Sequence, residues 1–328
     1  MTMERSWISA GDFIDLKYKL GQKGGIDLLS RLSLSGQNRT VNKWNNVTPG
    51  SDFWIIPEVR KRWNEKCTGN PDKAYEDYLV ENYLMNVSNL RLLSIGCGAG
   101  ARERSFGKYE NFYLIEGIDI ARTKIEEARK NALEAGLTNI QYHVTDFWTF
   151  QSVTEHYDII LFNSSLHHFK RIDELIRKKV LPIINEKGFL VVFEYVGPRR
   201  LQWTNKQLEY SNRLLTHIPE KYKIRFNSAS VKKKVYRPGW LRMCCNDPSE
   251  AAESDMILPI IHKYFKTLEE KKVGWDILHC LLKDISHNFL DDNDESKSLL
   301  NWLFDREDDY LRDTGRSDAI FGVYQKIS

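Results

Sequence analysis

Three glycines and one carboxylate have the types and the spacing of a nucleotide-binding turn. Gly96, Gly98 and Gly100 follow a short apolar run, and Asp119 ends the next apolar run 19 positions after Gly100. Glycine has no Cβ, so a ligand can approach the backbone closely, and an acidic side chain can accept from both hydroxyls of a ribose. A tight strand-to-helix turn without a ligand is the alternative. The pattern predicts a site for a cofactor that contains a nucleoside.

Two histidines and a glutamate form a second group, with residue types that suit acid–base chemistry. His167 and His168 follow one apolar run, and Glu194 lies near the end of the next. Histidine takes up a proton near neutral pH, and a carboxylate can orient an acceptor hydroxyl or accept its proton. Both histidines could instead be structural, and Glu194 could pair with Arg199 or Arg200. A single glutamate beside histidines does not define a metal site, so we predict no metal.

The elements that must position these residues alternate regularly. Apolar runs and helical patterns predict a parallel sheet with helices on both faces, which binds ligands at the carboxyl ends of its strands. The predicted strands cover about 92–96, 112–119, 140–146, 157–163 and 189–195, with helices near 101–108, 122–135 and 171–185. Four of these strands end on polar residues, namely Asp119, Asp146, Asn163 and Glu194. These ends are the strongest indication of a site.

The flanking segments are expected to cover the strand ends. Apolar and aromatic residues between 53 and 86 recur at helical spacing, with a break at 69–71, and predict two helices. Residues 196–250 interrupt the alternation and are interpreted as an inserted lid. Asp247 and Pro248 predict the start of a helix that runs to about residue 264. A further strand is expected near 265 and a last one at 319–326.

Composition excludes several classes of protein. The chain has 328 residues, is 41% hydrophobic and carries a net charge of +3, which by itself argues for neither nucleic acid nor membrane. No stretch has the length of a membrane span, and the first residues lack the apolar run of a signal peptide. The five cysteines include no C-x-x-C pair, so reduced thiols and a cytoplasmic location are expected.

Residues 95–100 and 117–119 resemble motif I and the strand-two acidic motif of class I S-adenosylmethionine-dependent methyltransferases. The resemblance implies an α/β fold with a Rossmann-like, mostly parallel seven-stranded sheet and helices on both faces. One position departs from the family, because many members carry Asp or Glu where Ser94 stands. We divide the chain into an N-terminal helical cap (1–87), a cofactor-binding core (88–195), an inserted lid (196–250) and a C-terminal part of the core with a helical insertion (251–328).

The resemblance also implies roles for individual residues. Asp146 would accept from the adenine amino group, with Phe147 beside the ring, although Asp146 could instead cap a loop. The loop after the fourth strand resembles that of many small-molecule methyltransferases, so His167, His168 and Glu194 would face the acceptor. The residues expected to hold S-adenosylmethionine are Gly96, Gly98, Gly100, Asp119, Ile120, Asp146, Phe147 and Asn163.

Residues 194–204 and 247–251 resemble a bacterial subgroup that is associated with glycosyltransferase or surface-polysaccharide systems. This likeness implies O-methylation of a small-molecule or sugar-like acceptor. Aromatic side chains in the lid could stack on a sugar ring or anchor the lid's own core. The predicted substrate residues are Arg199, Trp203, Tyr210 and Trp240.

Three other functions stay open at this point. The basic and aromatic stretch 232–240 could bind RNA, although the small net charge disfavours nucleic acid. The turn from Gly96 to Ala101 also fits the looser dinucleotide pattern of an NAD-dependent oxidoreductase. A binding module that keeps its cofactor without turnover is the third alternative. DNA amino-methyltransferases are disfavoured because Ser164 and Ser165 follow Asn163. The oligomeric state is not indicated.

Overall fold

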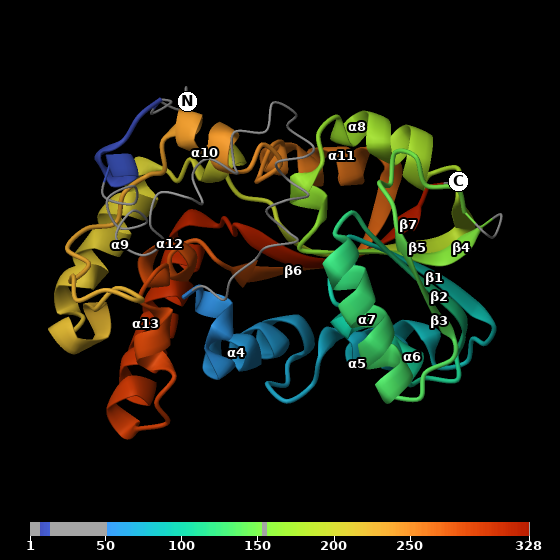
Figure 1. Cartoon of the computed structure of the whole chain (residues 1–328), viewed down its shortest axis with the longest axis horizontal. Helices are drawn as coiled ribbons and strands as arrows, with labels where there is room; N and C mark the ends of the chain where they lie inside the picture. The colour runs from blue at the N-terminus through green and yellow to red at the C-terminus, as the bar shows by residue number, and fades with distance from the viewer. Residues whose placement is uncertain (1–6, 14–50, 153–155, 328) are drawn as a thin grey trace.

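The computed structural model describes residues 7–13, 51–152 and 156–327. Most of the first 50 residues of the predicted cap therefore lie outside the described residues. In the described part, seven strands form one sheet (Figure 1). The strands are β1 (Leu90–Ile95), β2 (Phe112–Asp119), β3 (Ile140–Val144), β4 (Tyr157–Asn163), β5 (Ile184–Tyr195), β6 (Phe265–Gly274) and β7 (Ala319–Lys326).

The sheet has the strand order β3-β2-β1-β4-β5-β7-β6. The first five strands in this order are parallel to one another, and β7 is antiparallel to both β5 and β6. The predicted fold class, a mostly parallel seven-stranded sheet, is confirmed. Strand order reverses between β1 and β4, and the carboxyl ends of strands beside such a reversal form the crevice in which open α/β sheets bind ligands.

Helices cover both faces of the sheet because its strands are apolar on both sides. Leu92 packs into one core and its neighbour Leu93 into the other, as the alternation of side chains along a strand requires. The first core also holds α4 (Pro57–Thr68), α5 (Tyr75–Leu79) and α6 (Ala101–Gly107), and the second holds α8 (Ile172–Leu175) and α11 (Ile257–Tyr264). Figure 1 shows these two groups on opposite sides of the sheet.

The other helices include α7 and a set that extends the first core beyond the sheet. Leu214 of α9, Leu281 of α12 and Leu303 of α13 are all buried in that core. A capping box begins α9, where Thr204 and Gln207 each satisfy the other's backbone amide. The helices are α7 (Arg122–Glu134), α9 (Asn205–His217), α10 (Trp240–Asn246), α12 (Leu278–Leu282) and α13 (Asp294–Thr314).

The predicted helix start at Asp247 is wrong. Residues 247–250 form a bend and a turn, and the helix α11 begins only at Ile257. The Asp247 carboxylate does accept from the Ser249 amide, at 2.9 Å, but this bond closes a turn and caps no helix. The capping rule correctly indicated that Asp247 accepts from a nearby backbone amide, but it wrongly assigned this hydrogen bond to the start of a helix. The turn places the side chains of residues 247–250 beside the loop that follows β4.

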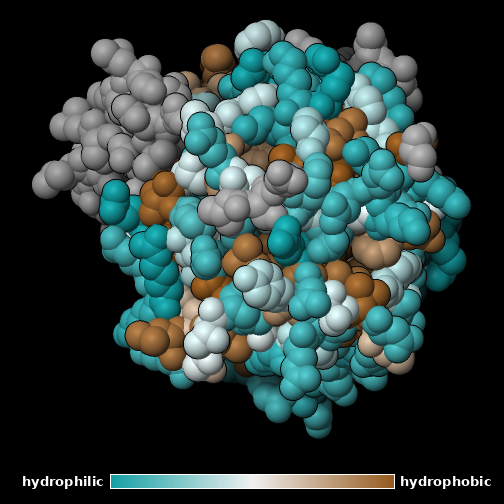
Figure 2. Space-filling model, turned by 90° about the vertical axis from the view of Figure 1, so that its right-hand side faces the viewer, coloured by the Kyte–Doolittle hydropathy of each residue, from teal (hydrophilic) through white to brown (hydrophobic). Residues whose placement is uncertain are grey.

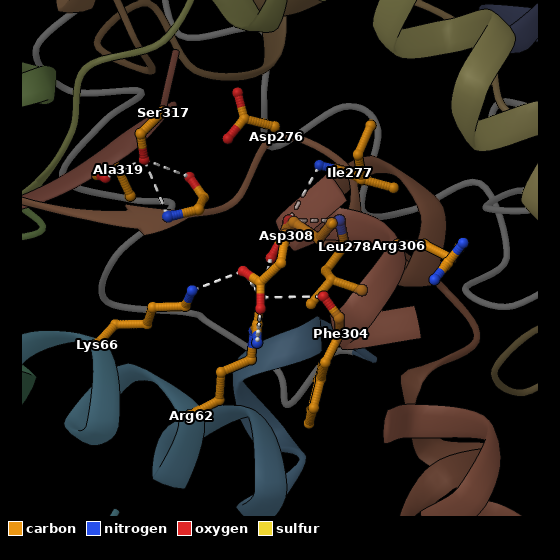
Figure 3. A network of polar contacts seen from close by, with 12 residues as sticks. Arg62, Lys66, Asp276, Ile277, Leu278, Phe304, Arg306, Asp308, Ser317 and Ala319 are labelled. Carbon is orange, nitrogen blue, oxygen red and sulfur yellow. Dashed lines mark hydrogen bonds and ion pairs between the residues drawn. The ribbon is translucent and has the colours of Figure 1, made fainter. Parts of the chain in front are cut away.

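A polar network joins α4 to α13 and to the start of α12 (Figure 3). Arg62 donates to both carboxylate oxygens of Asp308, at 3.1 and 2.8 Å. The neighbouring Glu307 is buried and accepts from the amides of Ile277 and Leu278, both at 3.1 Å. Amides at the start of a helix lack intrahelical partners, so this carboxylate fixes the first turn of α12. The segment around residue 277 is held in this way.

The face of the molecule in Figure 2 carries hydrophobic residues as separate areas among hydrophilic ones. Scattered apolar residues of this kind are normal on protein surfaces. Among the residues that the structure describes, no helix combines the length and the apolar character that a membrane span requires. All five cysteines are free thiols, as the sequence predicts.

Candidate active site

The turn after β1 is shaped for glycine at each of its three positions. Gly96, Gly98 and Gly100 have φ of +74°, +54° and +74°, a region that side chains with a Cβ rarely adopt. The amide of Gly96 donates to the Ile118 carbonyl at 2.8 Å, which ties the turn to β2. A Cβ placed on Gly98 would meet no atom within 4 Å. The turn therefore leaves open space beside Gly98.

Asp119 at the end of β2 is joined to this turn. One carboxylate oxygen accepts from the Gly98 amide at 2.9 Å and the other from the Ala121 amide at 2.8 Å. Burial raises the pKa of Asp119, although both amides oppose the rise. A carboxylate offers about four lone-pair sites, so these two bonds leave acceptor capacity for the hydroxyls of a ribose. The open space at Gly98 and the acceptor capacity of Asp119 fit an adenosine-containing cofactor.

Replacing Asp119 with alanine should weaken the binding of S-adenosylhomocysteine more than tenfold, or about 1.4 kcal/mol. The change removes the proposed acceptor of the ribose hydroxyls and the ligand of the Gly98 amide. Asp119→Asn keeps one acceptor oxygen and should lose less affinity. Calorimetric titration of both variants measures the effect, and unchanged affinity in Asp119→Ala would remove this residue from the site.

The other predicted cofactor residues lie at or after neighbouring strand ends. Asp146 follows β3 and accepts from the Trp148 amide at 2.9 Å, so it does cap a loop; contact with adenine stays a prediction. Phe147 is buried and packs edge-to-face against Phe162, which makes its ring part of the core. Asn163 ends β4 and accepts from the Tyr75 hydroxyl at 2.9 Å. Ile120 is partly buried directly after Asp119.

His167 and Glu194 are in direct contact beside the loop that follows β4. The Nδ1 atom of His167 bonds to one oxygen of Glu194, which is fully buried. The other oxygen accepts from the amides of Ser165 and Leu166, at 2.8 and 2.7 Å. These bonds fix the carboxylate against the loop after β4. A histidine held at Nδ1 by a carboxylate is oriented for proton transfer at Nε2.

The Glu194 carboxylate raises the proton affinity of His167. Burial lowers the pKa of His167, but the charge and the hydrogen bond of Glu194 outweigh it, and the pKa lies above the ordinary value. In the described part of the chain, Glu194 forms no ion pair with Arg199 or Arg200. Arg199 pairs with Asp255, and Arg200 donates to backbone carbonyls of residues 247, 248 and 250. Glu194 therefore acts on His167.

His168 is held by a different set of groups. Its Nδ1 lies 3.1 Å from the Ser249 hydroxyl, which donates to the Asp247 carboxylate at 2.5 Å. The rings of His167 and His168 are 4.2 Å apart between centroids. The turn at 247–250, which the sequence analysis assigned to a helix, thus supplies the side chains that orient His168. The capping signature gave no indication of this contact.

Glu250 of the same turn brings a third potential metal ligand close to the two histidines. Its carboxylate lies 3.8 Å from His167 Nε2, and one atom each of His167, His168 and Glu250 lies within 4.8 Å of the others. This trio could hold a divalent cation. A cation would have to displace the proton that Glu194 favours on His167. That the protein uses no metal therefore stays a prediction, and this cluster is the site at which it can be tested.

Treatment with EDTA is expected to leave methyl transfer and cofactor affinity unchanged. The control is the same protein with Zn²⁺ or Mg²⁺ restored after dialysis. A loss of activity that either ion restores would contradict the prediction and would identify the His167, His168 and Glu250 trio as a metal site. Elemental analysis of the purified protein gives an independent readout.

His279 on α12 is a neighbour that the sequence analysis missed. Its ring lies 5.2 Å from Phe53 and 5.6 Å from Trp203, and Tyr195 contacts both His279 (5.9 Å) and His167 (6.1 Å). Burial lowers the pKa of His279 to about 3, so the ring is neutral. The apolar pattern around residue 279 gave no signal for this histidine. An uncharged, aromatic wall therefore lies beside the His167–Glu194 pair.

The predicted substrate residues have structural partners. Arg199 donates to Asp255 at 2.8 Å. Trp203 is buried, and its indole nitrogen has no hydrogen-bond partner among the described residues. Tyr210 donates to a backbone carbonyl of α13 at 3.0 Å, and Trp240 begins α10. Of the four, the structure brings Trp203 into the aromatic wall around His279. Substrate contact for all four remains a prediction.

The fold and the glycine turn define an α/β protein that binds an adenosine-containing cofactor. Residues 86–271, more than half of the chain, match the family described as "Methyltransferase domain". The chain belongs to this family of class I S-adenosylmethionine-dependent methyltransferases. Its cofactor is S-adenosylmethionine, and the NAD-dependent alternative is set aside.

Similar proteins differ in their acceptors. The release factor glutamine methyltransferase of Buchnera aphidicola is 29% identical over 176 residues, which are 52% of this chain and 58% of that protein. The mitochondrial ubiquinone biosynthesis O-methyltransferase of Saccharomyces cerevisiae is 23% identical over 218 residues, 59% and 64% of the two chains. The matches thus span less than two thirds of either relative. The structure of the plantazolicin methyltransferase BpumL in complex with S-adenosylhomocysteine aligns with 96% of this chain and 97% of that chain. The sequence identity is 16% and the TM-score is 0.40.

Proposed function

We propose that the protein O-methylates a small or sugar-like acceptor, with His167 as the general base and Glu194 as a positioning residue. The observation that carries this proposal is the bond between His167 Nδ1 and the buried carboxylate of Glu194. A hydroxyl acceptor needs a base, and this pair supplies one at the carboxyl ends of the strands. The names of two curated relatives, from yeast and from Vibrio campbellii, describe O-methyltransferases and support the choice of oxygen.

The proposed mechanism assigns one task to each residue. When bound, S-adenosylmethionine supplies the activated methyl group, and the acceptor oxygen bonds to its carbon as the carbon–sulfur bond breaks. His167 Nε2 takes the hydroxyl proton. Glu194 holds the ring at Nδ1 and stabilises the imidazolium, while the amides of Ser165 and Leu166 keep the carboxylate in place. The buried position of the pair excludes water from the proton transfer.

The surroundings of the pair support a neutral acceptor. The aromatic rings around the neutral His279 provide an apolar wall with polar atoms in it, such as the indole nitrogens of Trp203 and Trp275. Sugar rings combine apolar faces with hydroxyls and suit such a wall. The resemblance to a polysaccharide-associated subgroup is consistent with this acceptor. The division into a cap, core, lid and C-terminal part, and the cytoplasmic location, remain predictions.

RNA is a weaker candidate acceptor. The basic stretch at 232–240 was the reason to consider it, yet Lys232 is buried and donates to the carbonyls of residues 280, 281 and 283. Burial lowers the pKa of Lys232 to about 8. Arg237 in turn donates to the Trp203 carbonyl at 2.7 Å. These two cations are part of the lid's own packing, which argues against a phosphate-binding surface built on them.

The test is methyl transfer from labelled S-adenosylmethionine to a panel of sugars, nucleotide sugars, small phenols and RNA. We expect a methyl ether on a sugar or small hydroxyl compound, formed by the wild type and formed at least about a hundredfold more slowly by His167→Asn. A methylated nitrogen, or a product that His167→Asn forms equally well, would overturn the proposal. Salt-sensitive transfer to RNA would favour the alternative.

A further inference from the structure

A buried carboxylate lies directly behind the glycine turn and has no role so far. Glu103 follows Gly100 by three positions in the first turn of α6 and is fully buried. Neither of its carboxylate oxygens accepts a hydrogen bond of ordinary geometry in the part of the chain that the structure describes, although the Ser94 hydroxyl lies close by. Buried polar groups are almost always paired, and an unpaired carboxylate is costly. Glu103 therefore requires an explanation.

The charges around Glu103 do not neutralise it. Glu76 of α5 is also fully buried; one of its oxygens binds Arg102 at 2.8 Å, and the other has no partner among the described residues. The cluster thus holds two carboxylates and one guanidinium. Burial raises the pKa of Glu103 to about 7, although the Ser94 hydroxyl and Arg102 favour its charged form. A further positive group would complete this cluster.

We infer that Glu103 binds the α-ammonium group of the methionine part of S-adenosylmethionine. The residue lies next to Ser94 of β1, the position at which the sequence resemblance leads one to expect a carboxylate. Here the acid comes from α6, and the serine leaves room for it. An ammonium group is the cationic part of this cofactor that a buried carboxylate can bind by a charge-assisted hydrogen bond. The inference rests on the cofactor of the family and not on the proposed acceptor.

The test compares two ligands that differ in the methionine part. S-adenosylhomocysteine has the ammonium group, and 5′-methylthioadenosine lacks the amino-acid part altogether. Calorimetry on Glu103→Gln should show S-adenosylhomocysteine bound at least tenfold more weakly and 5′-methylthioadenosine bound as in the wild type. Glu116→Gln is the matched control, because Glu116 is equally buried but has Tyr157 as a partner, and it should change neither affinity.

Thermal unfolding and pH separate binding from structure. Glu103→Gln without ligand should unfold at the same or a higher temperature, because an unpaired buried charge is removed. Wild-type affinity for S-adenosylhomocysteine should fall below about pH 7, where Glu103 becomes protonated, and the variant should lose this dependence. The other titratable groups near Glu103 are Glu76, Tyr75, Arg102, Cys97 and Tyr142.

Three results would overturn the inference. One is unchanged affinity for S-adenosylhomocysteine in Glu103→Gln. Another is an equal loss for both ligands, which would mean that the residue only shapes the turn. The third is a lower unfolding temperature, which would give Glu103 a structural partner. All three can be read without an acceptor, so failure here leaves the proposed O-methylation untouched.

Discussion

Replacing His167 with asparagine is expected to lower the rate of methyl transfer by about two to four orders of magnitude, the usual contribution of a general base. The affinity for S-adenosylhomocysteine should not change, because in the proposed mechanism His167 acts on the acceptor and does not hold the cofactor. Asparagine keeps a polar group that can bond to Glu194, so the loop after β4 should stay folded. Single-turnover rates and calorimetry on the same preparation measure the two effects.

Glu194→Gln tests the positioning role through the pH profile. The base works in its neutral form, so kcat/KM falls as pH drops through the pKa of His167, which lies above the ordinary value because of Glu194. Glutamine keeps an oxygen for the amides of Ser165 and Leu166 but removes the charge. The acid limb of the profile should therefore move to lower pH. An acid limb that does not move would exclude Glu194 as the cause of the shift.

Replacing Gly100 with alanine is expected to abolish cofactor binding and to destabilise the fold by about 2–4 kcal/mol. The backbone has φ of +74°, and the new Cβ would lie 2.3 Å from the Tyr142 hydroxyl and 2.9 Å from Ala128 Cβ. Tyr142 is buried, so its ring cannot move aside without disturbing β3. Chemical denaturation and titration with S-adenosylhomocysteine measure the two losses.

Two further glycines provide controls for this prediction. Gly98 has φ of +54° and open space around its Cβ position, so alanine should cost only about 1 kcal/mol of stability and still block the cofactor. Gly69 ends α4 with φ of +79° and lies away from the turn; alanine there should cost about as much and leave binding intact. Normal cofactor affinity in Gly98→Ala would mean that the open space is not the cofactor site.

The conformation of the glycine turn and the position of Asp119 could be predicted from the sequence more closely than the surroundings of His167, for a physical reason. Gly96, Gly98, Gly100 and Asp119 belong to one strand–turn–helix–strand unit, where local spacing and backbone conformation determine the geometry. His167, Glu250 and His279 come from segments far apart in the chain, and their approach depends on the path of the insertion. Rules based on neighbouring residues do not predict how the insertion runs through space. For this reason the turn at Asp247 was predicted to be the start of a helix.

Glu103 illustrates a second limit of sequence reasoning. A glutamate in the first turn of a helix is usually exposed and stabilised by the helix dipole, which is how its local sequence would be interpreted. Its burial follows from tertiary packing, because α6 turns this side chain towards Ser94 of β1. A serine on a buried strand is small enough to leave that space. The burial of Glu103 could be inferred only from Ser94 and Glu103 considered together, and not from either residue alone.

The position of β7 has a consequence for how the chain folds. Val192 of β5 pairs with Gly322 of β7, about 130 positions later, and β7 is the one neighbour of β6 among the strands that the structure describes. During synthesis the parallel strands β1 to β5 can associate early, whereas β6 leaves the ribosome before its pairing partner exists. Contacts of such long range slow folding and leave strand edges unpaired meanwhile. We expect the nascent chain to depend on chaperones until β7 has emerged.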